Sequence, residues 1–166
     1  KYAIATSNGT SALHISLLLA DVDQKSEVIT QPLTFVATCN AISYCGAKPV
    51  FVDILKDSWC LDPNKVEAAI NHRTKAIIAV HLYGNLCDMD SLFKIGKKYN
   101  IPIIEDAAEA IGSVYKGSPA GSMGMFGAFS FHGSKTITTG EGGMFVTNIS
   151  ELYEKVLTLS NHGRSR

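Results

Sequence analysis

Apolar and polar positions follow two patterns along the chain: short apolar runs, and longer segments with helical spacing. The apolar runs predict buried strands at residues 2–6, 27–30, 50–53, 75–81, 101–106, 125–131 and 144–147. Segments rich in helix formers predict helices at residues 12–20, 35–44, 63–71, 88–99 and 151–160. Strands that alternate with helices at this rhythm predict a three-layer α/β/α fold with a mostly parallel central sheet.

No repeat, low-complexity tract or linker interrupts this pattern, so we expect one domain over residues 1–166. A turn is expected at residues 46–49, and Asp62 is expected to cap the third helix. The chain begins directly on a strand-like segment and stops just beyond a helix-like one. This predicts a piece of a longer protein.

The composition is that of a globular protein, with 46% hydrophobic and 18% charged residues. Fifteen basic side chains balance fifteen acidic ones, so no excess of positive charge predicts binding to nucleic acid or to an anionic membrane. No apolar run reaches the roughly 20 residues that a membrane-spanning helix needs. Cys39, Cys45, Cys60 and Cys87 form no CxxC pair, which indicates reduced, mostly buried thiols of a cytoplasmic protein.

No metal site is expected. His81, Cys87 and Asp88 are possible ligand types, but their spacing follows no known metal-binding pattern. His81 follows a buried strand, where a hydrogen-bonded structural histidine is expected rather than a catalyst. His162 receives no role.

The segment with the clearest candidate chemistry joins the last two strands. Ser130 ends an apolar run, Lys135 follows it, and four glycines lie within the eleven residues 133–143. Glycines at this density let a backbone turn sharply and approach a ligand closely. A lysine held there with little solvent favours the free amine, which attacks carbonyl groups. The alternative is a solvated loop lysine beside ordinary turn glycines.

Two other segments carry candidate binding groups. Gly9, Thr10 and Ser11 open a buried helix, whose N-terminus would take a phosphate readily. The alternative, which is compatible, is that Thr10 or Ser11 caps the helix. Asp106 ends the strand at 101–106, either as a ligand contact or as the cap of a following helix. Ligands of open α/β sheets bind at the carboxyl ends of strands, so these groups are expected to meet.

Together these groups match the needs of one cofactor. A phosphate-binding turn, the aromatic ring of Phe35, the carboxylate of Asp106 and the amine of Lys135 suit pyridoxal 5'-phosphate. A carboxylate near its ring nitrogen would keep that nitrogen protonated.

Six segments in order along the chain then carry a resemblance to a known family. They are SNGTSAL at 7–13, PLTFVAT at 32–38, VHLYG at 80–84, EDAAE at 105–109, SFHGSK at 130–135 and GEGG at 140–143. On these motifs the chain resembles the DegT/DnrJ/StrS family of sugar aminotransferases, which are fold-type-I pyridoxal-phosphate enzymes. The segments at 135–144 and 59–62 look most like the GDP-perosamine synthases of that family.

The resemblance implies roles for individual residues. Lys135 would carry the cofactor, Asp106 would pair with the pyridine nitrogen, and Phe35 would stack on the ring. Thr10, Ser11 and Ser130 would hold the phosphate at the turn of Gly9, and Glu109 would lie near the 3-hydroxyl of the ring.

The resemblance also implies a reaction and an assembly. An amino group would pass, from glutamate, to a nucleotide-linked 4-keto-6-deoxy sugar in surface (lipopolysaccharide) polysaccharide biosynthesis, with Lys135 as acid and base. Relatives are homodimers with an N-terminal arm and a C-terminal small domain, which this chain would lack.

Three other functions are alternatives to this one. A non-catalytic relative that acts as a binding or regulatory module, or a sugar 3-dehydratase, would be expected to lack Lys135, which is present. A dinucleotide-binding domain would carry GxGxxG after the first strand, and the turn at residues 8–11 does not.

Overall fold

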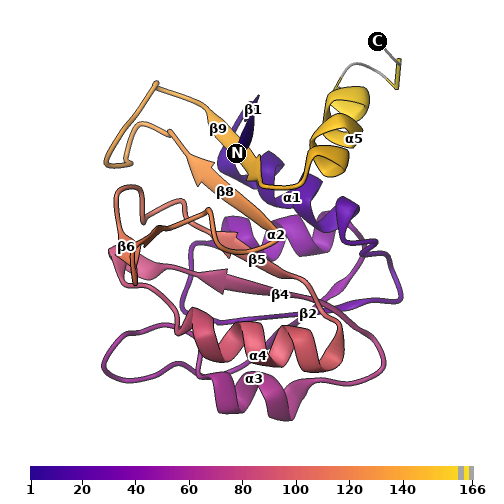
Figure 1. Ribbon diagram of the computed structural model, residues 1–166, viewed down its shortest axis with the longest axis vertical. Coiled ribbons are helices and arrows are strands. Elements are labelled where there is room, and N and C mark those ends of the chain that lie inside the picture. The colour runs from indigo at the N-terminus through magenta and orange to yellow at the C-terminus, as the bar shows by residue number, and fades with distance from the viewer. Residues whose placement is uncertain (161–162, 165–166) are drawn as a thin grey trace.

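The computed structural model describes residues 1–160 and 163–164 of the chain. Within them a sheet of seven strands has the order β1-β9-β8-β5-β4-β2-β3 (Figure 1). The strands are β1 (Tyr2–Thr6), β2 (Glu27–Thr30), β3 (Lys48–Phe51), β4 (Thr74–Val80), β5 (Ile103–Asp106), β8 (Phe126–Ser130) and β9 (Gly143–Thr147). The strands β8, β5, β4, β2 and β3 run parallel, and β9 lies antiparallel between β1 and β8. The prediction of a mostly parallel sheet is confirmed.

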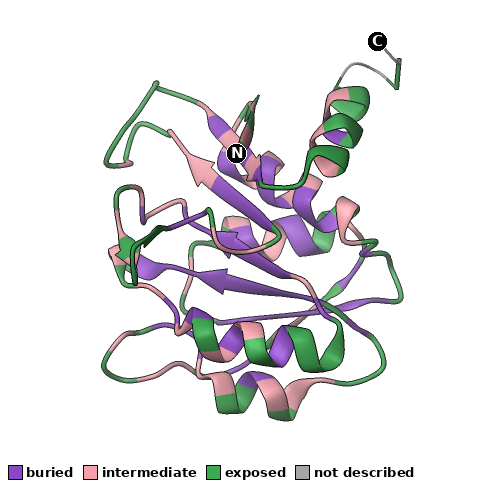
Figure 2. Cartoon of the chain, in the orientation of Figure 1, coloured by how far each residue is buried: buried purple, intermediate pink, exposed green. Residues whose placement is uncertain are grey.

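Helices cover both faces of the sheet, which confirms the three layers. One face carries α1 (Gly9–Leu19), α2 (Val36–Tyr44) and α5 (Ser150–Ser160), and the other carries α3 (Pro63–Ala69) and α4 (Met89–Tyr99). Neighbouring residues of a strand point to opposite faces. Ile78 of β4 therefore lies in the core with α1 and α2, and Ile77 lies in the core with α3 and α4. Figure 2 shows the central strands buried between these layers.

Helix α1 begins earlier than the sequence predicts, and a different residue caps it. Asn8 is the N-cap, and its side-chain oxygen accepts a hydrogen bond from the Ser11 amide at 2.8 Å. The prediction of Thr10 or Ser11 as the cap was wrong, because both lie in the first turn. Asp62 caps α3 as predicted, accepting from the Asn64 amide at 2.9 Å.

Strand β3 also begins two residues earlier than predicted. It pairs in parallel with β2, from Glu27 opposite Lys48 to Thr30 opposite Phe51. Pro49 is accommodated because β3 is the edge strand. The expected turn at 46–49 is therefore confined to its start, where Gly46 has a φ of 74°.

A short hairpin escaped the sequence analysis. Strands β6 (Val114–Tyr115) and β7 (Ser118–Pro119) pair antiparallel. Lys116 and Gly117 between them have φ values of 49° and 88°, which is typical of a tight type I′ hairpin turn. Strands of two residues are too short to show an alternating pattern.

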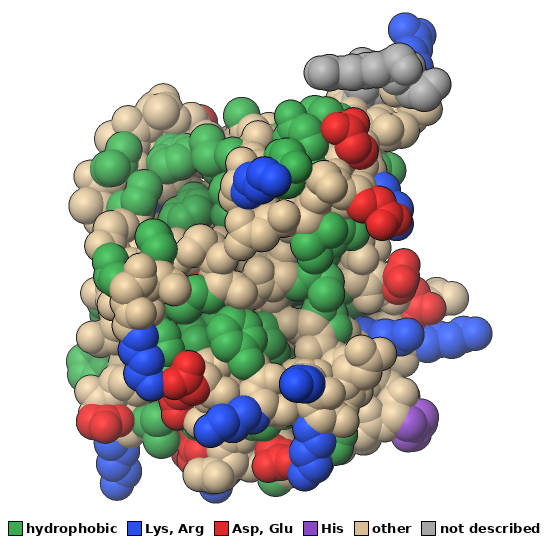
Figure 3. Space-filling view, viewed as in Figure 1, with side chains coloured by type: hydrophobic (Ala, Val, Ile, Leu, Met, Phe, Trp, Pro, Cys, Tyr) green, Lys and Arg blue, Asp and Glu red, His purple; other side chains and the backbone are tan. Residues whose placement is uncertain are grey.

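The distribution of charged side chains on the surface agrees with the balanced charge of the sequence. Figure 3 shows acidic and basic side chains interspersed over the lower part of one face, where α3 and α4 lie. The Lys98 ammonium, for example, lies 2.7 Å from the Glu67 carboxylate.

All four cysteines are free, with Cys60 and Cys87 buried. Across residues 1–160 and 163–164 no helix has the length and apolar character needed to cross a membrane.

Candidate active site

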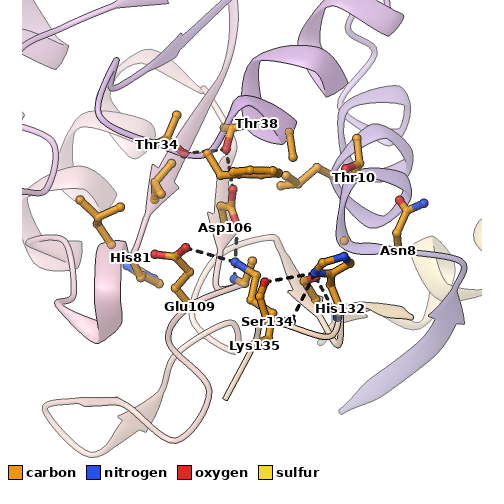
Figure 4. Close-up of a pocket in the computed structure, with 18 of the residues that line it drawn as sticks. Asn8, Thr10, Thr34, Thr38, His81, Asp106, Glu109, His132, Ser134 and Lys135 are labelled. Carbon is orange, nitrogen blue, oxygen red and sulfur yellow. Dashed lines mark hydrogen bonds and ion pairs between the residues drawn. The ribbon is translucent and has the colours of Figure 1, made fainter. Parts of the chain in front are cut away.

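A cavity of about 360 Å³ lies at the carboxyl edge of the sheet, where β1, β2, β4, β5 and β8 end. The segments that follow these strands converge on it, although they are far apart in the sequence (Figure 4). Seven of the predicted site residues line it: Gly9, Thr10, Phe35, Asp106, Glu109, Ser130 and Lys135. The prediction that these segments meet at one edge is confirmed.

Asp106 lies at the inner end of the cavity and is only 6% exposed. The Thr38 hydroxyl donates to its Oδ2 at 2.7 Å, and the Ala108 amide donates to its Oδ1 at 3.2 Å. Burial raises the pKa of Asp106, while the bonds from Thr38 and Ala108 act in the opposite direction. A turn follows Asp106, so it does not cap a helix. Its carboxylate is therefore available to a cationic group in the cavity.

The Lys135 amine approaches the cavity from the glycine-containing loop after β8. Its Nζ lies 3.1 Å from Glu109 Oε1, and the Lys135 side chain is only 16% exposed. The Lys135 side chain is therefore largely shielded from solvent, unlike that of a solvated loop lysine. Figure 4 shows Lys135 and Glu109 facing each other below Asp106. The amine is close enough to Asp106 for its charge to lower the pKa of that carboxyl, against the larger effect of burial.

The N-terminus of α1 forms the opposite end of the cavity. Gly9 packs so closely on β8 that a Cβ atom there would lie 2.9 Å from Ser130 Cβ. This close approach needs a glycine, and it brings the first turn of α1 beside the Ser130 hydroxyl. Amide groups in a first helical turn lack intrahelical acceptors and attract anions. Gly9, Thr10 and Ser130 therefore form a site suited to a phosphate.

Ser11 is the predicted site residue that does not line this cavity. Its hydroxyl lies 3.0 Å from both Ser7 Oγ and Asn8 Oδ1, and it lines a neighbouring hollow between α1 and α2. The position of Asn8 as the cap explains this difference.

Phe35 forms one wall of the cavity. It is the residue before α2, its side chain is 68% exposed, and its ring centroid lies 5.9 Å from Lys135 Nζ. A flat aromatic ring at this place could stack on a planar ligand.

Several residues that support the site were not assigned by the sequence analysis. Thr34 and Thr38 form a hydroxyl pair at 2.8 Å that orients the bond to Asp106. Glu105, the neighbour of Asp106, is fully buried and points to the opposite face, where the His81 ring contacts it at 3.0 Å. The structural, hydrogen-bonded histidine predicted at 81 is found. The position of Thr38 one helical turn after Phe35 was the sequence signal that could have assigned it to the site.

The cysteines near the site are part of the packing. The Cys87 thiol donates to the Val80 carbonyl at 3.3 Å, and the Cys60 thiol donates to the Asn85 carbonyl at 3.3 Å. The neighbouring Cys87 side chain lowers the pKa of Cys60 to about 7, and the Cys60 side chain together with burial raises the pKa of Cys87 above its usual value. In the described part of the chain no group of three or more His, Cys, Asp and Glu side chains could hold a metal ion.

Known proteins are similar to this chain in sequence and in fold. The profile of the DegT/DnrJ/EryC1/StrS aminotransferase family matches residues 1–166. The chain is 48% identical over 163 residues to a GDP-perosamine synthase of Caulobacter vibrioides, covering 98% of this chain and 44% of that protein. The chain therefore spans less than half the length of this curated relative.

Solved structures agree. An aminotransferase from Psychrobacter cryohalolentis matches with a TM-score of 0.97 and 43% identity, over 99% of this chain and 42% of that one. A protein from Streptococcus pneumoniae described as a sugar aminotransferase, in its PLP form, matches with a TM-score of 0.91 and 37% identity. That match covers 98% of this chain and 47% of the other. Family and neighbours together imply pyridoxal phosphate as the cofactor.

Proposed function

Since this chain belongs to the DegT/DnrJ/EryC1/StrS aminotransferase family, we propose that it forms the cofactor-binding part of a pyridoxal-phosphate-dependent sugar aminotransferase. The proposed reaction moves an amino group, from glutamate, to a nucleotide-linked 4-keto-6-deoxy sugar. The observation that carries the proposal is the presence of the Lys135 amine and the buried Asp106 carboxylate in one cavity. A GDP-linked sugar is the first substrate to test, because a relative 48% identical is named GDP-perosamine synthase.

The residues of the cavity fit this cofactor. Its two ends differ in chemistry: a helix N-terminus with hydroxyl groups at one, and a buried carboxylate at the other. The first suits a phosphate, and the second suits a protonated ring nitrogen. A Cβ atom at position 9 would crowd Ser130, so the close packing at the phosphate end of the cavity requires glycine at this position.

Each residue would then have a separate task. Gly9, Thr10 and Ser130 would bind the phosphate, and Phe35 would pack on the ring. Asp106, oriented by Thr38, would hold a proton at the ring nitrogen. When bound, the cofactor supplies an electron sink for the carbon that loses a proton. Lys135 would bind the cofactor and, when released, take and return that proton.

Partners of the whole protein follow from the same proposal. Glutamate and a nucleotide-linked keto sugar would use the cavity in turn. We propose that the full-length protein is a homodimer, and that its place is in surface polysaccharide biosynthesis in the cytoplasm. The Tyr83 amide binds Glu109 of the cavity lining, and the Tyr83 and Trp59 rings, which are 72% and 49% exposed and 6.5 Å apart, are available for such contacts.

The test is an assay of the full-length protein with glutamate and a panel of GDP- and UDP-linked 4-keto-6-deoxy sugars. We expect one sugar to be aminated, and Lys135→Arg to lower the rate by more than about 10³-fold because arginine keeps a charge but cannot carry the cofactor. Lys98→Arg, the same change at an exposed lysine that does not line the cavity, is the matched control and should leave the rate unchanged. Amination by Lys135→Arg at the wild-type rate would refute the role of Lys135. Cofactor binding without amination of any sugar would support the non-catalytic alternative.

A further inference from the structure

We propose that His81 is a positioning residue: fixed by Glu105, it holds the loop of residues 82–87 and thereby sets Glu109 against the Lys135 amine. This inference deepens the proposed function and rests on it for its catalytic meaning. Its structural basis lies in contacts that do not involve the cofactor.

The orientation of the His81 ring is determined from both sides. The ring is fully buried, its Nε2 lies 3.0 Å from Glu105 Oε2, and its Nδ1 accepts a hydrogen bond from the Cys87 amide at 3.3 Å. Because Nδ1 is an acceptor, the ring proton lies on Nε2 and is donated to Glu105. A single tautomer therefore satisfies both partners.

Glu105 cannot move with the ring, because backbone groups hold both of its oxygens. Oε2 also accepts from the Gly121 amide at 2.8 Å. Oε1 accepts from the amides of Met123 at 2.7 Å and Gly124 at 2.6 Å. A carboxylate that accepts from four donors is a rigid anchor for His81.

The loop from 82 to 87 is joined to His81 at both ends. The His81 amide donates to the Asp106 carbonyl at 3.1 Å, which extends the pairing of β4 with β5, and its ring binds the Cys87 amide at the other end. Between these points Tyr83 has a φ of 53°, which is uncommon for a bulky residue and costs energy. The contacts at the two ends of the loop offset this cost.

The strained residue is the one that contacts the site. The Tyr83 amide donates to Glu109 Oε2 at 3.1 Å, and Glu109 Oε1 lies 3.1 Å from Lys135 Nζ. Figure 4 shows His81 and Glu109 on the same side of the cavity. If the loop relaxes, Glu109 loses its backbone donor, and the side chain that faces the amine is no longer held in place.

Two substitutions separate the contacts of His81. In His81→Asn the side-chain oxygen can occupy the place of Nδ1 and still accept from Cys87. In His81→Gln the amide reaches the place of Nε2 and can still donate to Glu105, but the acceptor for Cys87 is lost. If His81 acts through the loop, His81→Asn retains its function and His81→Gln does not.

The first test measures amide hydrogen exchange in the cofactor-free full-length protein. We expect the amides of Tyr83 and Cys87 to exchange at least about 10-fold faster in His81→Gln and within about threefold of wild type in His81→Asn. Unchanged protection of Ile77 and Ile78 in β4 would show that the variants are folded. Wild-type exchange at Tyr83 in a folded His81→Gln protein would overturn the proposal.

A measurement on the wild type covers the case in which His81→Gln does not fold. Nitrogen chemical shifts of the His81 ring must show a protonated Nε2 and an unprotonated Nδ1. The opposite tautomer would overturn the proposal.

The consequence for the site is tested by borohydride trapping of pyridoxal phosphate on Lys135. We expect the concentration that gives half-maximal trapping to rise about 10-fold in His81→Gln and to stay near wild type in His81→Asn. In Glu109→Gln the added His81→Gln change should have no further effect, since the proposed route passes through Glu109. A full additional loss in the double variant would overturn that route. An absence of trapping in the wild type would refute the proposed function and leave the exchange result standing.

Discussion

Two adjacent carboxylates of β5 have opposite environments. Glu105 is fully buried on the side of the sheet away from the cavity, and Asp106 lies on the cavity side. Burial raises the pKa of Glu105, but donors from His81, Gly124 and Gly121 outweigh it, so the pKa lies below its usual value. Burial also raises the pKa of Asp106, and there its donors do not outweigh it.

The two carboxylates differ in the number of their hydrogen-bond donors. Glu105 accepts from an imidazole and three backbone amides, whereas Asp106 accepts from one hydroxyl and one amide. A carboxylate with all its acceptor sites filled stabilises a fold. One that is short of donors keeps capacity for a cationic ligand. We therefore assign Glu105 to the scaffold and Asp106 to the site.

The largest effect on stability is expected from Glu105→Gln. The glutamine amide would place N–H groups against amides that already donate, so the free energy of unfolding should fall by about 3 to 5 kcal/mol. Chemical denaturation at pH 7 measures it. The exposed Glu67→Gln, which removes a surface partner of Lys98, is the matched control and should change little. An unfolding free energy for Glu105→Gln close to that of wild type would contradict a stabilising role for Glu105.

The contribution of Glu105 to the free energy of unfolding should depend on pH, in a direction set by the lowered pKa of its carboxyl. The pKa of Glu105 is lower in the folded state than in the unfolded state, so its contribution is complete above the unfolded value of about 4.3 and is lost as the pH falls through the folded value. The gap between wild type and Glu105→Gln should be constant from pH 7 to about pH 5.5 and should narrow below about pH 4. A gap that widens with acid would contradict the assignment.

Asp106→Asn should have the next largest effect, and on function instead of stability. We expect the rate of amination to fall by about 10²- to 10³-fold, because the amide cannot hold a proton at the ring nitrogen. The cofactor-free protein should unfold at the same or a higher temperature than wild type, since the folded state disfavours the charged form of Asp106. Thermal unfolding without added cofactor measures the second part. A large loss of stability would place Asp106 in the scaffold together with Glu105.

Thr38→Val should also lower the rate of amination, but by less than Asp106→Asn. It removes the 2.7 Å bond to Asp106, a hydrogen bond to a charged group worth about 1.5 to 3 kcal/mol. The pKa of Asp106 should rise further, so the acid limb of the activity profile should move to higher pH. Thr38→Ser, which keeps the hydroxyl, should retain the wild-type limb. An acid limb unmoved by Thr38→Val would show that Asp106 does not set it.

Much of the fold could be predicted from the sequence, because apolar runs and helical spacing are local signals. The strand that ends at Asp106 and the helix that begins after Asp62 were both predicted. The start of β3 was missed because pairing with β2 decides it, and the turn at Lys116 was missed because two-residue strands carry no pattern. The cap at Asn8 was missed because Thr10 and Ser11 are also good capping residues.

The site was less predictable than the fold for a physical reason. The meeting of Asp106 with Lys135 could be inferred, since Asp106 ends one strand, Lys135 follows another, and both strands end at one edge of the sheet. The role of Glu105 could not, because its amide donors lie in the irregular loop at 121–124, and only the folded chain brings them to β5. Neighbouring residues of a strand point to opposite faces, but this alternation does not tell which donors each acid meets.

One measurement tests the central claim most directly. Full-length wild type and Asp106→Asn would be incubated with pyridoxal phosphate, reduced with borohydride, digested, and mapped by mass spectrometry. The account predicts a reduced pyridoxyl group on Lys135 in the wild type, with markedly less in Asp106→Asn at the same cofactor concentration. Labelling spread over exposed lysines such as Lys98 and Lys116, with no preference for Lys135, would contradict it.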